Sequence, residues 1–584
     1  RLRRVARTSE ATKQEVREAS REYRKAREEA TVARALCDAA LALRLGLANG
    51  PILDEDGAIS VAGRPAVAPV LAQLQAVHLP VLFPEVFVRD RPGFDVILGN
   101  PPWDKVRHEP KQFWVVRDPG LNALPANKRD ARVDELRFER PAEAAEERAE
   151  HALRERLQQV ARTGFSLLGS GHFDFAKLFA ERFLGALREG GSLGIVMPQT
   201  LLLLGGWSKL RTNLLDRGDV EAVEARNTGG WLFEDVDGRV TVTLLSIRPA
   251  RNPAGNQVEI LPGVTSMERF RLAKTVGRMK MTVADLDALS EGRVVPWFND
   301  PNDATVFSVM RAQPTLLSGD GWISGKSDSS RWDFSGSGKH KAYAATTKSS
   351  TSAWAVLMTR HVDQYQIADD PIQRWVNDLP ALAAAHPTRG MRIVNGQAQL
   401  TDDHPVITYR FPSRNDDSRT VIATAMPGSG FFFSTGYSHG ISHPAGTAIT
   451  NKLALLGYLN TIVADWWARR FVDRHVGSRI INGMKLPNWS DMQCNTASRL
   501  TSELLVRGGL SVLPGGHPVT SDPALHSRTD VELRVELDKL ALDGFGLDTT
   551  HAEVILGDFK ETADSIPLSY RELLFSAMTK GPVG

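Results

Sequence analysis

The tetrapeptide Asn100-Pro101-Pro102-Trp103 is the part of this sequence whose residue types are best suited to chemistry. Asn100 offers a side-chain carbonyl and Pro101 a backbone carbonyl, and the prolines stiffen the backbone so that both acceptors are held before a ligand arrives. Two such acceptors can take the two hydrogens of the exocyclic amine of adenine, draw its nitrogen toward tetrahedral geometry and aim the lone pair at a methyl donor. Trp103 adds an aromatic face for a base swung out of a duplex. No general base with a shifted pKa is needed, because the proton leaves after the amine has become cationic.

The segment before the tetrapeptide predicts where it lies in a fold. Residues 94–98 form a short, mostly apolar run closed by Gly99, a pattern typical of a buried parallel strand. Asn100 then lies just beyond the carboxyl end of that strand, where open α/β sheets bind their ligands.

The elements that follow predict an α/β fold with a Rossmann-like, doubly wound sheet. An amphipathic helix is expected over residues 173–188, with phenylalanines repeating every four residues, and Gly190-Gly191 should end it. Further strands are expected over residues 194–198, 220–225 and 240–247, and a further helix over residues 207–215.

Taken in order, these segments resemble the gamma-class N6-adenine DNA methyltransferases of type IIG restriction-modification, DISARM and BREX defence systems. The similarity rests on residues 82–87, 93–103, 173–179, 191–200 and 226–233, and it spans about residues 82–247. The resemblance implies methyl transfer from S-adenosylmethionine to the N6 amine of adenine in double-stranded DNA, at Asn100, Pro101, Pro102 and Trp103.

The resemblance also assigns roles to three residues beyond the tetrapeptide. Trp231 or Phe233 would pack on the other side of the flipped base, although either is equally well explained as core. Asp174 would help to place the adenosine of the donor, although a cap of the helix beginning there explains it as well or better.

The glycine-rich turn with which this family binds its donor is not found in the sequence. Residues 1–93 contain no Asp-Pro-x-x-Gly-x-Gly block, and the chain begins with Arg1. We therefore expect the main donor site to lie upstream of Arg1, in a missing N-terminal portion or in a partner chain, and we expect the chain alone to be inactive or nearly so.

The C-terminal part matches the place of the family's target recognition domain. Its loops interleave basic and aromatic residues, a mixture that can track phosphates and stack on bases, although a solvated loop surface is the alternative for any one residue. The DNA-binding candidates are Lys326, Arg331, Lys339, Lys341, Lys348, Arg470 and Arg474, with Trp332, Tyr343, Arg469, Arg479, Asn482 and Lys485 as further candidates.

Length and composition set the outer limits. The chain of 584 residues predicts several domains: a helical segment over 1–75, the catalytic region over 76–250, a mixed α/β recognition domain over 251–490 and a helical C-terminal cap over 491–584. The net charge of +2 requires any nucleic-acid footprint to be local. Cys37, Cys494 and the fourteen histidines show no ligand spacing, so no metal is inferred, and the two cysteines fit a reducing cytoplasm.

Two other functions compete with a methyltransferase component. One is a fused restriction-modification enzyme whose nuclease lies upstream, since Asp558-Phe559-Lys560 has no convincing partner carboxylate for a metal. The other is a DNA-recognition module without catalysis, which would have no need for a base-holding loop. No apolar run approaches the ~20 residues that span a bilayer.

Overall fold

The computed structural model of this chain describes residues 12–579, apart from 170, 172, 239, 250–255, 277, 291, 415–416, 473–474, 561 and 563–565. The fold is mixed α/β and divides into two compact units. The first unit comprises Arg1–Ile260 with Lys280–Val283, and the second comprises Leu261–Met279 with Ala284–Gly584.

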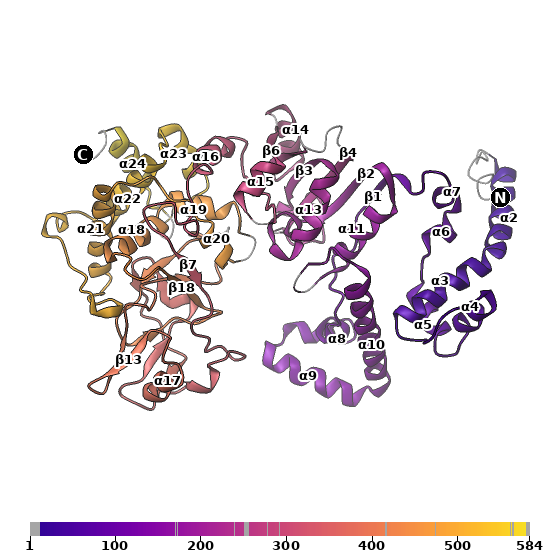
Figure 1. Cartoon of the computed structure of the whole chain (residues 1–584), viewed down its shortest axis with the longest axis horizontal. Helices are drawn as coiled ribbons and strands as arrows, with labels where there is room; N and C mark the ends of the chain where they lie inside the picture. The colour runs from indigo at the N-terminus through magenta and orange to yellow at the C-terminus, as the bar shows by residue number, and fades with distance from the viewer. Residues whose placement is uncertain are drawn as a thin grey trace. The chain divides into compact units, whose positions relative to one another are not determined.

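The first unit begins with short helices (Figure 1). The helices predicted for residues 1–48 are present from Lys13 onward, and residues 1–11 lie outside the described part of the chain. A capping box starts the first helix, because Thr12 accepts from the backbone of Glu15 while the Glu15 side chain accepts from the backbone of Thr12. The helices are α2 (Lys13–Glu29), α3 (Thr31–Arg44), α4 (Glu55–Ala62), α5 (Ala68–Leu74), α6 (Leu79–Leu82) and α7 (Pro84–Phe87).

A six-stranded sheet follows, with strand order β1-β2-β4-β3-β5-β6. Its strands are β1 (Phe94–Gly99), β2 (Leu187–Pro198), β3 (Gly218–Arg226), β4 (Thr241–Pro249), β5 (Gln257–Val264) and β6 (Met279–Thr282). β1, β3 and β4 lie where the sequence predicted strands. β2 is longer than predicted, because it begins at Leu187 and runs through Gly190-Gly191.

The strand directions are not all parallel. β1 pairs with β2 in parallel, whereas β4 is antiparallel to both β2 and β3. The physical reason is the short connection between β3 and β4, since adjacent strands joined without a crossover helix must run in opposite directions.

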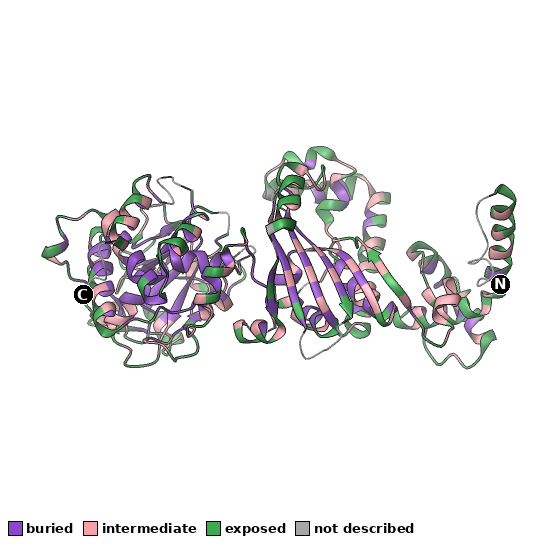
Figure 2. Ribbon diagram, turned by 90° about the horizontal axis from the view of Figure 1, so that it is seen from above, coloured by how far each residue is buried: buried purple, intermediate pink, exposed green. Residues whose placement is uncertain are grey.

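Helices cover one face of this sheet. Helix α11 (Phe175–Ala186) and helix α13 (Ser208–Arg217) lie together, and the Arg217 guanidinium donates to the carbonyl of Leu184 at 3.1 Å. The residues of β2 on that face, Leu193, Ile195 and Met197, are buried. Along β2 the intervening residues are only half-buried, as the alternating burial of the strands in Figure 2 shows.

β1 is an edge strand and not the buried strand that the sequence predicted. Among the described residues it pairs only with β2, and Val96 and Leu98 on its open face are 58% and 80% exposed. The Leu98 side chain lies over Gly194 of β2, where an added Cβ would come 2.5 Å from Leu98 Cδ2. An edge strand with exposed apolar side chains is a surface that another element normally covers.

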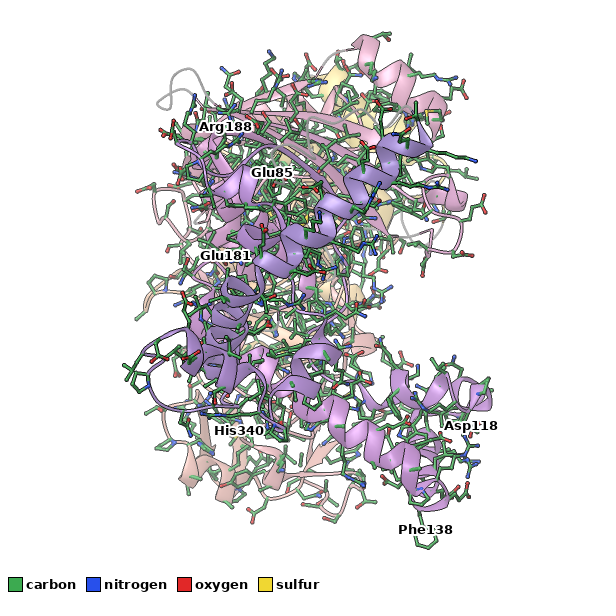
Figure 3. The ribbon with its side chains drawn as sticks, turned by 90° about the vertical axis from the view of Figure 1, so that its right-hand side faces the viewer. Glu85, Asp118, Phe138, Glu181, Arg188 and His340 are labelled. Atoms are coloured by element: carbon green, nitrogen blue, oxygen red, sulfur yellow. The ribbon has the colours of Figure 1, made fainter. Side chains whose placement is uncertain are left out.

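A helical insertion, not predicted from the sequence, separates the tetrapeptide from α11. It contains α8 (Pro110–Val115), α9 (Ala126–Glu139) and α10 (Pro141–Gly164), with Trp114 fully buried among them. Arg137 donates to both carboxylate oxygens of Glu147, which lowers the pKa of Glu147 to about 2. Asp118 and Phe138 lie at the end of the insertion farthest from the sheet (Figure 3).

The described residues of the second unit form two small four-stranded sheets, a two-stranded sheet of β10 (Val362–Asp363) and β11 (Gln366–Ile367), and a hairpin. One sheet has the order β17-β9-β12-β8 and the other β16-β15-β18-β7. Their strands are β7 (Lys326–Asp328), β8 (Ala344–Ala345), β9 (Trp354–Val356), β12 (Trp375–Val376), β15 (Ile407–Arg410), β16 (Ala423–Ala425), β17 (Phe431–Phe432) and β18 (Ser438–Ser442). The hairpin consists of β13 (Met391–Val394) and β14 (Gln397–Leu400).

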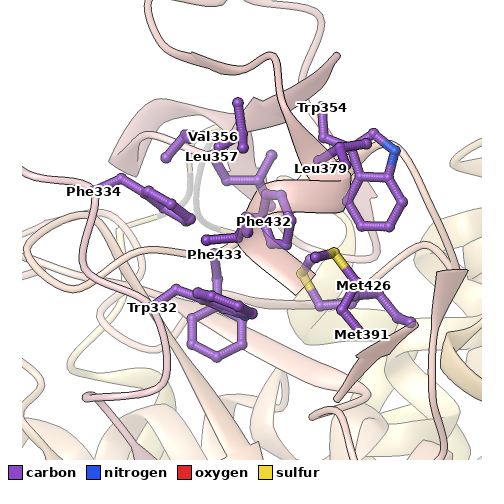
Figure 4. Close-up of a cluster of buried hydrophobic side chains, with 13 residues drawn as sticks. Trp332, Phe334, Trp354, Val356, Leu357, Leu379, Met391, Met426, Phe432 and Phe433 are labelled. Carbon is purple, nitrogen blue, oxygen red and sulfur yellow. The ribbon is translucent and has the colours of Figure 1, made fainter. Parts of the chain in front are cut away.

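An aromatic cluster forms the core of this β-rich part (Figure 4). Trp332 and Phe334 stack with ring centroids 5.7 Å apart, and both are fully buried. The segment 315–352 is largely irregular, as predicted, but it is not simply exposed, because these two rings anchor it.

Helices complete the second unit. Residues 451–472, predicted as one apolar helix, form α18 (Ile449–Leu459) and α19 (Ile462–Arg469). The C-terminal helices α21 (Asp491–Arg507), α22 (Asp530–Phe545), α23 (Thr549–Leu556) and α24 (Tyr570–Thr579) belong to the same unit. The Trp489 indole donates to the Leu540 carbonyl at 2.8 Å, and the buried Asp538 accepts from the Ile462 amide at 2.8 Å.

Candidate functional site

The tetrapeptide follows the carboxyl end of β1 directly. The last strand residue, Gly99, pairs with Ile195 of β2, and an added Cβ at Gly99 would lie 3.1 Å from the Phe183 ring of α11. A side chain at position 99 would require the Phe183 ring to shift by a few tenths of an ångström. Asn100 is exposed, so its amide is not consumed by packing, whereas Pro101 is buried and fixes the backbone carbonyl that follows the strand.

Hydrogen bonds tie the loop after the tetrapeptide to the start of α11. The Phe175 amide donates to the Asp104 carbonyl at 2.9 Å, and Lys105 forms an isolated β-bridge with Asp174. The loop is therefore held at both ends, by β1 before it and by the first turn of α11 after it.

Asp174 caps α11, as the structural alternative in the sequence analysis proposed. Its carboxylate accepts from the Lys177 amide at 3.0 Å, which satisfies one of the free donors of the first helical turn. Burial raises the pKa of Asp174 above its usual value. Asp174 lies beside the candidate loop, but its capping hydrogen bond accounts for an aspartate at this position without any ligand.

Trp103 is half-buried, and the N–H of its indole has no hydrogen-bond partner among the described residues. Leaving a buried donor unpaired costs about 1–3 kcal/mol. A ligand that offers an acceptor at this point would recover part of that cost.

Lys177 is a site residue that the sequence analysis missed. Its side chain is buried, and its ammonium donates to the carbonyl of Gly206 at 2.8 Å and to that of Leu168 at 3.2 Å. The ammonium also lies 4.8 Å from the centroid of the Trp207 ring, and burial lowers its pKa. Lys177 thus fastens the segment before α11 to the segment after β2. Lys177 belongs to the Asp-Phe-Ala-Lys segment at the start of the predicted helix, but its position in the sequence does not distinguish a buried lysine from a solvated one.

A buried asparagine organises the loop that carries the two base-stacking candidates. The Asn227 amide donates to the carbonyls of Phe233 and Val236, both at 2.8 Å, and its oxygen accepts from the amides of Leu232 and Phe233, both at 3.0 Å. Trp231 donates from its indole to the Arg226 carbonyl at 2.8 Å. Both Trp231 and Phe233 are half-buried, so neither is a fully enclosed core residue.

Four of the basic candidates in the second unit are exposed: Lys326, Lys339, Lys341 and Lys348. Lys348 lies 4.8 Å from the centroid of the Trp375 ring. Arg331 differs, because its guanidinium is paired with Asp328 at 2.8 Å and is only partly accessible. Arg474 lies outside the described residues.

Arg470 does not face solvent, which contradicts its predicted contact with DNA. It is fully buried and forms ion pairs with Asp303, at 2.6 Å, and with Asp558. Arg470 thus joins two aspartates that are far apart in sequence inside the second unit, so the arginine serves the fold. The same contact accounts for Asp558, which was considered as a nuclease residue and set aside.

Other further candidates are also internal. Trp332 is part of the aromatic core, Arg469 is buried against Asp465 at 2.8 Å, and the Lys485 ammonium donates to the Gln313 carbonyl at 2.7 Å. The Asn482 oxygen accepts from the Ser327 amide at 2.8 Å. The sequence placed all four of these residues on a DNA-binding surface. In the fold their side chains instead pack against or bond to other segments of the second unit.

Neither a metal centre nor a membrane span is found among the described residues. They contain no group of three histidine, cysteine, aspartate or glutamate side chains arranged to hold an ion. Their helices include none with the length and apolar character to cross a bilayer.

Comparison with known proteins gives structural similarity only. No family model matches the sequence, and no curated protein matches it. Solved structures with similar regions belong to restriction-modification enzymes and methyltransferase subunits. The type IIG restriction endonuclease BpuSI is 11% identical, with a TM-score of 0.27, over 69% of this chain and 51% of that one.

Two further structures have similar regions. The type IIL restriction-modification enzyme MmeI in complex with DNA is 11% identical over 83% of this chain and 57% of that one, with a TM-score of 0.34. A type I methyltransferase subunit from Streptococcus thermophilus is 12% identical over 35% of this chain and 38% of that one, with a TM-score of 0.21. The chain thus spans about half the length of the first of these proteins.

Proposed function

We propose that this chain is the base-holding and DNA-recognising part of a site-specific N6-adenine DNA methyltransferase of a restriction-modification or phage-defence system. One observation carries the proposal. A rigid Asn-Pro-Pro-Trp loop leaves the carboxyl end of β1 with Asn100 exposed, and it is braced from behind by the Asp104–Phe175 hydrogen bond.

The proposed mechanism assigns the loop two acceptors. The Asn100 side-chain oxygen and the Pro101 carbonyl accept the two hydrogens of the adenine amine, which turns its lone pair out of the ring and toward the methyl donor. The benefit is positional, because the proline-stiffened backbone holds the acceptors before the base arrives. Trp103 would stack on the base. When a bound donor gives up its methyl group and leaves as the neutral thioether, the cationic amine would lose its proton to solvent.

S-adenosylmethionine would supply the methyl group, but the described residues do not make a complete site for it. Asp174 is occupied in capping α11, and the segments around β1 contain no glycine-rich turn. We therefore propose that another portion, in the same polypeptide or in a partner chain, holds the donor.

The open edge of β1 supports this part of the proposal. Among the described residues its outer backbone edge has no partner strand, and the exposed Val96 and Leu98 add apolar side chains close to the tetrapeptide. A strand added to this edge would extend the sheet and bring the donor-binding portion beside Asn100.

Trp231 and Phe233 remain candidates for the second stacking contact. The Asn227 hydrogen bonds hold their loop in one conformation while leaving both rings partly accessible. A preorganised loop with accessible aromatic rings suits base stacking better than a fully buried pair would.

Exposed lysines of the second unit support DNA binding. Lys326, Lys339, Lys341 and Lys348 can contact phosphates, and Lys348 beside Trp375 pairs a cation with an aromatic ring. Arg331 would first have to leave Asp328, so we give it a smaller role.

The test is the identity of the product. The chain, assembled with the portion that supplies the donor site, is incubated with duplex DNA and S-adenosylmethionine carrying an isotopically labelled methyl group, and nucleosides are analysed by mass spectrometry. We expect labelled N6-methyl-2′-deoxyadenosine. Sequence-specific binding without any labelled base would favour the recognition-module alternative, and labelled cytosine would contradict the proposed chemistry.

A further inference from the structure

The β13–β14 hairpin has one face in the core of the second unit and one face in solvent. Across it Met391 pairs with Leu400, and Arg392 pairs with Gln399. Because side chains alternate along a strand, neighbouring pairs point to opposite faces. Met391 and Leu400 are buried in the aromatic cluster of Figure 4, so Arg392 and Gln399 project outward, and both are exposed.

The polar groups on the outer face are not used by the fold. Of the residues that the structure describes, none forms a hydrogen bond or ion pair with the side chains of Arg392, Gln397 or Gln399. Residues 391–400 contain no aspartate or glutamate. Two acidic residues follow the base: Asp402 pairs with His517 at 2.7 Å, and Asp403 accepts from the Thr401 hydroxyl.

The hairpin is also preorganised. Asn395 and Gly396 form its two-residue turn with φ of 51° and 78°, the left-handed values that a tight hairpin turn requires. At its base, the Thr401 amide donates to the Gly390 carbonyl and the Leu400 amide to the Gly428 carbonyl, both at 2.9 Å. Little conformational entropy would be lost if this face met a ligand.

We propose that this hairpin enters the major groove and reads base edges, an inference that rests on the proposed DNA-modifying function. A two-stranded ribbon fits the major groove, which is about 12 Å wide. The paired Arg392 and Gln399 are the residue types that recognise guanine and adenine through two hydrogen bonds each. Gln397 extends the same face toward the tip.

Two exposed lysines flank a histidine that packs against the segment leading into the hairpin. His340, which lies between the exposed Lys339 and Lys341, packs its ring 4.7 Å from that of His386, four residues before Gly390. These lysines are placed to contact phosphates on the groove edge while the outer face reads the bases.

The test selects binding sites from randomised duplexes with the full chain, so it does not depend on methyl transfer. We compare the unaltered chain, the Arg392→Ala/Gln399→Ala double variant, and an Arg414→Ala control that removes an exposed arginine elsewhere in the same unit. We expect the double variant to lose about 10-fold or more of its base preference at one or two adjacent positions, with nonspecific binding kept within about 2-fold. The control should keep the original preference.

The outcomes separate this proposal from the proposed function. If the unaltered chain selects a sequence and the double variant selects the same one equally strictly, the hairpin does not read bases, and a protein partner becomes the better occupant of its outer face. If the unaltered chain selects no sequence at all, the proposed function itself is contradicted. Thermal unfolding of the double variant, expected to match that of the unaltered chain, excludes loss of structure as the cause.

Discussion

The backbone amide of Phe175 donates a hydrogen bond to the backbone carbonyl of Asp104 at 2.9 Å, across the whole α8–α10 insertion. This contact fixes the far side of the Asn-Pro-Pro-Trp loop to the first turn of α11. The near side is fixed by β1, so the loop is held between two rigid elements. Such support is what a site needs when its catalysis depends on position.

Asp174 is predicted to act as a helix cap and not as a donor contact. Asp174→Ala should destabilise the first unit by about 1 kcal/mol, whereas Asp174→Asn, which can still cap, should be close to neutral. Thermal unfolding measures the first effect. The KM for S-adenosylmethionine in the assembled enzyme tests for donor contact, and we expect it to be unchanged in Asp174→Asn. A KM about 10-fold higher in that variant, at unchanged stability, would show that the carboxylate contacts the donor.

Asn227 is predicted to hold the Trp231–Phe233 loop. Asn227→Ala should lower the free energy of unfolding of the first unit by about 2–4 kcal/mol, because it removes four hydrogen bonds to part-buried backbone groups. Asn213→Ala is a matched control, since that side chain makes one exposed contact with Arg217 and should cost less than about 0.5 kcal/mol. Equal denaturant midpoints for the two variants would contradict the role of Asn227.

Arg470 is predicted to be a stability residue. Arg470→Ala should destabilise the second unit by about 3–5 kcal/mol, because Asp303 and Asp558 would be left buried without their shared cation. Lys339→Ala, on an exposed lysine, should change stability by less than about 0.5 kcal/mol. Chemical denaturation checks both, and a stable Arg470 variant with weakened DNA binding would restore the original DNA-contact assignment.

Lys339 and Lys341 are predicted to contact phosphates. Each lysine-to-alanine change should weaken DNA binding about equally for all sequences and should reduce the slope of log affinity against log salt concentration by about 1. Fluorescence anisotropy over a range of salt concentrations measures the slope. A loss of affinity confined to one sequence would instead indicate base contacts.

The sequence predicted the elements around the tetrapeptide well because their signals are local. An apolar run ending at Gly99, a phenylalanine repeat from Phe175 and a valine-rich run before Pro249 each correspond to an observed strand or helix. Pairing partners are not local signals. Nothing in residues 94–98 reveals that one face of β1 stays open, and nothing in β4 reveals its antiparallel direction.

The basic candidates show the same limit. Arg470 and Lys339 look alike in sequence, yet their environments differ. Arg470 is enclosed by Asp303, 167 residues before it, and by Asp558, which comes later in the chain, whereas Lys339 is exposed. Burial of a charge depends on distant partners, which a single sequence does not disclose. The Arg392–Gln399 pair was overlooked for a related reason, because neither residue is notable until the hairpin places them side by side.

The account depends most on Asn100, and one comparison tests it directly. In the assembled enzyme, single-turnover formation of N6-methyladenine in duplex DNA is measured for the unaltered chain, for Asn100→Ala and for the Asn213→Ala control. We predict that Asn100→Ala slows methyl transfer by about 100-fold or more while DNA affinity stays within about 3-fold, and that the control is unaffected. Methyl transfer by Asn100→Ala at the rate of the unaltered chain would contradict the proposed role of the loop.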